Sequence, residues 1–182
     1  GAFCDIVYMY YFSEVLFLKP KIRVRVFAAV ASVIMMITIF LMSAQSGEKS
    51  AELSGGVTES VLERTDGSFS ELDSNKKAEK IEYIGKFVRK AAHVAEYFVL
   101  CGLFSIFAMT FDINRFVACG VAFIGAVLYA VGDEIHQLFV PGRCGLLKDV
   151  LIDSAGALIG AGFVCLIYFT SEKVRKKKCG TE

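Results

Sequence analysis

The chain has 182 residues, of which 55% are hydrophobic, and its mean hydropathy is +0.54. Soluble domains have an apolar share nearer about 45–50%, so this composition disfavours an ordinary soluble protein and favours several membrane-spanning helices of about 20 residues each. The formal net charge of +1 gives no reason to expect a nucleic-acid partner. The six cysteines include no Cys-x-x-Cys pair, so neither a zinc site nor a disulfide framework is expected.

The first 18 residues are apolar and rich in aromatic side chains, but they carry Asp5 and Glu14. We expect this stretch to form a helix that lies on the cytoplasmic membrane interface, with a fifth membrane span as the alternative. A basic run over residues 19–25 follows, so residues 1–25 are predicted to form an N-terminal interfacial and basic segment.

Four apolar runs follow, at about residues 26–42, 87–109, 116–132 and 150–169, and the third continues as helix to about residue 139. Lysine and arginine residues precede the first run and follow the last one. Because such residues prefer the cytoplasm, both termini are expected there, and this requires an even number of spans. The predicted fold class is therefore all-α: a polytopic bundle of four transmembrane helices forming one domain over residues 1–182.

The connections between the spans differ in length and charge. Residues 43–86 are predicted to be an external loop, in which nine acidic residues outnumber six basic ones. Gly55-Gly56 and similar clusters predict turns that separate two short helices, at 57–64 and 76–84, in a small, partly ordered cap, with a solvated loop as the alternative. The second external connection is residues 140–148, residues 110–115 form a cytoplasmic turn, and residues 170–182 form a basic cytoplasmic tail.

The second span carries charged residues on one helix face. Arg89, His93 and Glu96 have the spacing i, i+4, i+7, with Lys90 and Tyr97 beside them. Ionisable groups at this depth cost several kcal/mol, so they usually have a partner or a function. A histidine one turn from a glutamate favours acid–base or ligand-binding chemistry. The structural alternative pairs Arg89 with Glu96 or with a neighbouring helix.

The third span ends in a second polar cluster. Asp133 and Gln137 are i, i+4 neighbours, and Glu134 lies about 100° around the helix. Two adjacent carboxylates repel one another unless protons or cations intervene. The cations expected on the same side of the membrane are Arg89, Lys90, Arg143 and Lys148. A charged helix end in solvent is the alternative interpretation.

The turn that follows contains Pro141 and Gly142, which would fix the direction of Arg143. The planar guanidinium of arginine suits phosphate or carboxylate groups. The alternative is an arginine that extends to the membrane interface.

The fourth span opens with Asp149 and Asp153, again at i, i+4. Asp149 suits a helix N-terminus, whereas Asp153 is a full turn deeper and needs a partner, for which Arg89 and Arg143 are the candidates. Below them, the motif Gly156-x-x-x-Gly160 predicts that another helix packs closely against this span.

One topology places all these clusters on the same side of the membrane, where Ser43 and Gln45 end the first span. We therefore predict one polar pocket in the outer leaflet. The candidate catalytic residues are His93, Glu96 and Asp133. The candidate binding residues are Ser43, Gln45, Arg89, Lys90, Tyr97, Glu134, Gln137, Arg143, Lys148, Asp149 and Asp153. No cofactor is expected, although a divalent cation bound by His93, Glu96, Asp133, Asp149 and Asp153 is an alternative, with Mg²⁺ or Ca²⁺ favoured.

These clusters resemble the VanZ-like family of bacterial membrane proteins in their order and spacing. The matching pieces lie between residues 43 and 160 and include Arg89-Lys90-x-x-His93-x-x-Glu96-Tyr97 and Asp149-x-x-x-Asp153. The resemblance implies a multi-pass protein of the bacterial plasma membrane, and the founding member is associated with resistance to the lipoglycopeptide teicoplanin. Asp153 departs from the asparagine expected in many relatives, which argues against an acid-catalyst role for it.

Three functions remain open at this point. The first is an enzyme that acts on an anionic amphiphile at the outer leaflet. The second is a non-catalytic module that binds or shields a membrane lipid, a lipid-linked cell-wall precursor or a lipoglycopeptide. In the third, the clusters form an internal salt-bridge network and partner proteins carry the function. The oligomeric state is left open.

Overall fold

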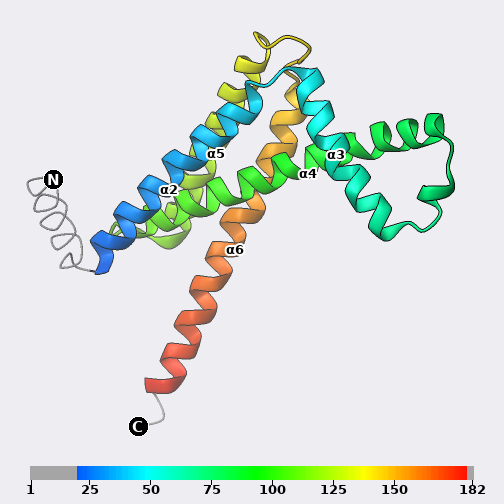
Figure 1. Ribbon diagram of the computed structural model, residues 1–182. Helices are drawn as coiled ribbons and strands as arrows, with labels where there is room; N and C mark the ends of the chain where they lie inside the picture. Colours follow the sequence, from blue (N-terminus) through cyan, green and yellow to red (C-terminus); the bar gives the residue numbers. More distant parts are fainter. Residues whose placement is uncertain (1–19, 180–182) are drawn as a thin grey trace, which may run out of the picture.

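The computed structural model describes the backbone of residues 20–179 and the side chains of residues 21–173, so the interfacial helix expected over residues 1–18 lies outside the described part (Figure 1). Over the described backbone the chain is all-helical, with one short 3₁₀ helix, η1, and no strand. The elements are α2 (Pro20–Ser43), α3 (Gly47–Thr65), η1 (Phe69–Glu71), α4 (Ser74–Met109), α5 (Arg115–Gln137) and α6 (Leu147–Cys179).

Four of these helices, α2, α4, α5 and α6, are long and apolar enough to cross a membrane, which confirms the four predicted spans. Many of their large apolar side chains point away from the protein: Phe27 is 70% exposed, Phe116 67% and Leu128 67%. Such a surface is unfavourable in water and suits hydrocarbon, so the bundle has the outer surface of a membrane protein.

Small residues hold the spans together. On α5 a stripe of alanines at every fourth position is buried, comprising Ala118, Ala122, Ala126 and Ala130. On α6, a Cβ built on Gly156 would overlap the carbonyl of Val94, and one on Gly160 would overlap that of Phe98. The close contact predicted below the α6 aspartates is thereby confirmed, and its partner is α4. Helix α4 contacts α2, α3, α5 and α6, so it is the centre of the bundle.

The region between the first two spans is more helical than predicted. Instead of two short helices, α3 runs unbroken from Gly47, and α4 continues from Ser74 through the whole second span. The pair Gly55-Gly56 was wrongly interpreted as a turn. It lies inside α3, where a Cβ on Gly55 would come within 3.4 Å of Ile81 on α4, while Gly85 faces Ser54. These small residues permit close helix packing rather than a reversal of the chain.

The link between α4 and α5 marks one end of the bundle, where charged groups are closely paired. Arg25 of α2 donates hydrogen bonds to the side chain and to the carbonyl of Thr110, both at 3.0 Å. Lys21 pairs with Asp112 at 2.7 Å, and this ion pair lowers the pKa of the Asp112 carboxyl. Arg115 donates to the carbonyl of Met109. We call this the paired end.

Candidate functional site

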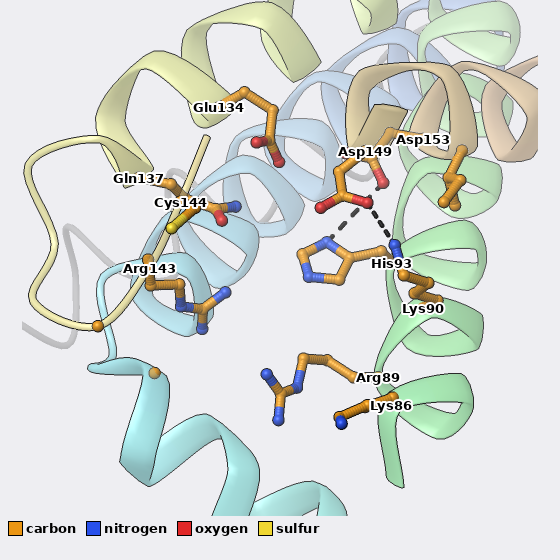
Figure 2. Close-up of a pocket in the computed structure, with 13 residues that line it drawn as sticks. Lys86, Arg89, Lys90, His93, Glu134, Gln137, Arg143, Cys144, Asp149 and Asp153 are labelled. Atoms are coloured by element: carbon orange, nitrogen blue, oxygen red, sulfur yellow. Dashed lines mark hydrogen bonds and ion pairs between the residues drawn. The ribbon is translucent and has the colours of Figure 1, made fainter. Parts of the chain in front are cut away.

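A cavity of about 180 Å³ opens at the other end of the bundle, where α2 ends and α6 begins (Figure 2). Helices α4, α5 and α6, the first residue of α3 and the α5–α6 loop all contribute to its wall. The lining residues are Gly47, Lys86, Arg89, Lys90, His93, Glu134, Gln137, Gly142, Arg143, Cys144, Asp149, Ile152 and Asp153. Segments that are more than 100 residues apart in sequence therefore meet in one polar cavity.

Arg143 enters this cavity from the α5–α6 loop. Gly142 has a φ of +71°, a conformation that L side chains rarely adopt, and it turns the chain just before the arginine. The guanidinium donates from Nε to the carbonyl of Gln45 and from Nη2 to that of Met42, both at 3.0 Å. Two of the last carbonyls of the α2 segment are thereby satisfied. Burial, together with the nearby positive charge of Arg89, lowers the pKa of Arg143.

Arg89 reaches the cavity from α4, and its guanidinium is the least satisfied cation there. Nη2 donates to Ser54 Oγ at 3.3 Å, whereas the buried Nε has no hydrogen-bond partner. Within the described part of the chain, neither Arg89 nor Arg143 forms an ion pair with a carboxylate. Two guanidinium groups thus face one cavity without a counter-charge in direct contact.

The lysines on the same wall are paired differently. Lys90 forms a 2.5 Å ion pair with Asp149 at the start of α6, which joins α4 to α6 at the cavity rim. Lys86, one turn earlier, pairs with Glu82 on its own helix at 2.9 Å. The arginines, rather than the lysines, therefore retain donor capacity toward the cavity.

His93 lies between two carboxylates at the α4–α6 contact. Its Nδ1 is 3.8 Å from Glu96 Oε2 and 3.8 Å from Asp153 Oδ1, too far for a hydrogen bond in either case. Asp153 is only 1% exposed, and its Oδ2 has no hydrogen-bond partner. The expectation that Arg89 or Arg143 would pair with Asp153 is wrong, since the group beside this carboxylate is His93.

The two acidic residues near the end of α5 make different hydrogen bonds. Glu134 accepts a hydrogen bond from the backbone N–H of Leu146 at 2.8 Å, which fastens the α5–α6 loop to the helix it leaves. Asp133 accepts from Gln137 Nε2 at 3.1 Å and lies behind the cavity wall. Both carboxylates are almost fully buried.

The structure places eight of the candidate site residues on the cavity wall: Arg89, Lys90, His93, Glu134, Gln137, Arg143, Asp149 and Asp153. The other six are not on it. Glu96 and Asp133 lie in a second layer behind His93 and Gln137, and Tyr97 and Ser43 are buried in the bundle with unpartnered hydroxyls. Gln45 contributes its backbone carbonyl to Arg143, and Lys148 is exposed at the start of α6.

Other lining residues were not anticipated. Lys86 lies one turn before Arg89 and Lys90, so the i, i+4 spacing of α4 was an available signal for it. Gly47 and Cys144 on the wall, and Ser54 beside Arg89, come from connections whose path the residue types do not determine. A Cβ on Gly47 would overlap the backbone of Gly142, which shows that the two connections touch.

Among the side chains that the structure describes, no three histidine, cysteine or acidic groups come close enough to hold a metal ion. The lining set is instead rich in nitrogen donors, with two arginines, two lysines and one histidine. Such a set suits a negatively charged ligand.

Comparison with known proteins agrees with the resemblance noted from the motifs. Neither the curated proteins nor the solved structures that were searched contain a match to this chain. Residues 27–168, which include the cavity and all or most of each of the four spans, match the VanZ/LLP1 family. With most of its length matched and its four apolar helices in place, the chain is a membrane protein that belongs to the VanZ/LLP1 family.

Proposed function

We propose that the cavity binds the anionic head group of an amphiphile at the outer face of the bacterial plasma membrane. The observation that carries this proposal is the pair formed by Arg89 and Arg143, which line one cavity without an ion-paired carboxylate. Two like charges repel one another at the edge of a low-dielectric region, and an anion between them turns this repulsion into attraction. Guanidinium groups bind phosphate and carboxylate oxygens with paired hydrogen bonds.

The size of the cavity limits what it can hold. A volume of about 180 Å³ is below the range of about 300–1,000 Å³ that is typical of sites enclosing a drug-sized ligand. A phosphate or carboxylate group fits this space, while the remainder of the molecule would lie outside it. We therefore favour a lipid-linked cell-wall precursor, or a lipoglycopeptide such as teicoplanin, whose acyl part stays in the membrane.

A salt-bridge network that only holds the helices together is less well supported. Lys90 and Asp149 form a direct ion pair between two helices of the cavity wall. Among the described residues Arg89 forms no such pair, and Asp153 keeps one oxygen without a hydrogen-bond partner. A purely structural role would predict that the arginines are paired, because leaving one charge of a buried set unpartnered costs stability.

Binding to defined lipids in detergent tests the proposal. Arg89→Gln and Arg143→Gln should each weaken binding of a polyprenyl phosphate about tenfold or more, because each removes a charge-assisted hydrogen bond. Arg64→Gln, on the exposed last turn of α3, is the matched control and should bind as the wild type does. Neutral polyprenol should bind weakly to all four proteins. Equal binding of the phosphate by wild type and both cavity variants would reject the proposal.

A cellular assay separates the two classes of ligand. If the ligand is a lipoglycopeptide, expression in a susceptible bacterium should raise the teicoplanin concentration needed to stop growth, and Arg89→Gln should abolish this effect. If a cell-wall precursor is the ligand, susceptibility to vancomycin, which lacks the acyl chain, should change in parallel.

A second candidate function is acid–base chemistry on the bound molecule. It is favoured by His93, which lines the cavity and lies 3.8 Å from carboxylate oxygens of both Glu96 and Asp153. In this arrangement His93 would exchange a proton with the ligand, while Glu96 and Asp153 would balance the imidazolium charge. Mass spectrometry of the lipids after incubation should then detect a product with the wild type and none with His93→Gln, although binding persists. Binding without any product would reject acid–base chemistry and leave anion binding as the supported function.

A further inference from the structure

Helix α3 has three distinct faces that the anion site does not explain. Ser54, Thr58 and Leu62, at i, i+4 and i+8, are buried. Beside them, Leu53, Val57 and Val61 form a second line with the same spacing and are 46%, 55% and 51% exposed.

The remaining face of α3 is acidic. It carries Glu48, Glu52, Glu59 and Glu63, which lie within about 60° of one another on a helix of 3.6 residues per turn. The centre of this acidic face is about 150° away from the centre of the line of Leu53, Val57 and Val61. A helix that is exposed on two sides, one apolar and one charged, has the pattern of a helix that lies in a membrane interface.

The position of α3 in the chain agrees with this pattern. Helix α2 has exposed Phe40, Leu41 and Met42 up to its last turn, and only three residues separate its end from the start of α3. Figure 1 shows α3 turning away from α2 beyond this short link and running beside the first part of α4. The apolar line of α3 therefore begins close to the level at which the lipid-facing surface of α2 ends.

We propose that α3 lies on the membrane, with Leu53, Val57 and Val61 immersed in the boundary between head groups and acyl chains, and with its glutamates directed to water. The attraction comes from apolar burial rather than from charge, because four glutamates outnumber Lys49 and Arg64 on this helix. Since Ser54 of α3 accepts the hydrogen bond from Arg89, the membrane-bound helix also sets the position of one cavity arginine.

The absence of tryptophan from the sequence makes a direct test possible. Val57→Trp places one fluorophore on the proposed membrane face, and Glu59→Trp places one on the acidic face as a matched control. Both sites are exposed, so neither substitution fills a packed core. In proteoliposomes with lipids brominated near the head of the acyl chain, the fluorescence of Val57→Trp should be quenched severalfold more strongly than that of Glu59→Trp. The degree of quenching should not change with the salt concentration, because apolar burial holds the helix on the membrane.

Equal quenching at the two positions, or strong quenching of Val57→Trp by aqueous acrylamide, would overturn the proposal. If Val57→Trp is protected from acrylamide but not quenched by the brominated lipids, a protein surface covers this face and the proposal also fails. Val61→Trp, one turn further, is the second reporter if Val57→Trp does not fold. The outcome does not depend on whether the cavity binds an anion.

Discussion

The two ends of the helix bundle contain similar cations but treat them differently. At the paired end, Arg25 makes two 3.0 Å hydrogen bonds to Thr110, and Lys21 pairs with Asp112. At the cavity end, Arg143 is held in a similar way by the carbonyls of Gln45 and Met42, but Arg89 makes one hydrogen bond of 3.3 Å and keeps a buried, unpartnered Nε. Partners already in place tie Arg25 and Lys21 to the fold, whereas an unpartnered donor at the edge of a membrane, such as Arg89 Nε, is available to a ligand.

Arg89 is one of several residues at the cavity end that have a buried polar group without a partner. His93 Nδ1, Asp153 Oδ2 and the Tyr97 hydroxyl are also buried without hydrogen-bond partners. Each such group costs stability, so the cavity end stores an unfavourable free energy that the paired end does not. Proteins commonly accept such a cost where the groups have a function.

The largest change in the free energy of unfolding is expected for a substitution in the α4–α6 contact, which lies between the two ends. Gly160→Ala should lower the free energy of unfolding by about 3 kcal/mol, because the added methyl group would overlap the backbone carbonyl of Phe98. Gly162→Ala is the matched control, since nothing lies within 4 Å of its new methyl group, and it should be neutral or slightly stabilising. Unfolding in mixed detergent micelles measures both, and similar losses would contradict the packing described here.

A pair of arginine variants tests the comparison itself. Arg25→Gln should lower the free energy of unfolding by about 1–3 kcal/mol, because it removes two hydrogen bonds made by a charged donor. Arg89→Gln should change it by less than about 0.5 kcal/mol, as expected for a side chain with one long hydrogen bond. The ligand-binding assay should give the opposite order. If Arg89→Gln proves the more destabilising variant, its charge serves the fold.

Asp153→Asn should raise the free energy of unfolding by about 1 kcal/mol, because a neutral amide costs less to bury than a carboxylate with an unpartnered oxygen. A thermal melt in detergent measures the change. A decrease would mean that the contact with His93 is a stabilising ion pair, and a double-mutant cycle with His93→Gln would then reveal the coupling.

The smallest effect is expected at the ion pair that links the start of α4 to the end of α3. Lys80 and Ser68 lower the pKa of the Asp66 carboxyl to about 2 by hydrogen bonding. A lowered pKa means that this carboxylate stabilises the fold above its ordinary pKa of about 4, and that the contribution is lost as the pH falls through about 2. Asp66→Asn should therefore match the wild type in melting temperature at pH 2 and fall slightly below it at pH 6.

Much of this architecture follows from helix geometry, and the sequence motifs predicted that part correctly. The spacing of Arg89 and His93 fixes them on one face of α4, and the glycines at 156 and 160 can serve little purpose other than close packing. Four apolar runs of sufficient length determine the number of spans. These features depend on a single helix or on one pairwise contact, so the local sequence contains the necessary information.

The details of the site depend on how helices rotate relative to one another, and sequence spacing does not fix this rotation. Asp153 was expected to meet an arginine and instead lies beside His93. Lys148 was expected on the cavity and is exposed, because Asp149, its neighbour, turns inward to pair with Lys90. The glycines in α3 were misassigned because a turn and a close helix contact require the same residue type.

The link between Arg143 and the end of α2 has a consequence for how the protein is made. Gln45 and Arg143 are separated by 98 residues, so the carbonyl of Gln45 must wait for the guanidinium while α3, α4 and α5 are synthesised, and the carbonyl of Met42, which accepts from the backbone N–H of Gln45, waits for its second donor. At about 5–20 residues per second, this delay is roughly 5–20 s. The first span therefore enters the bilayer with an unfinished end, and the arginine that completes it also completes the cavity wall.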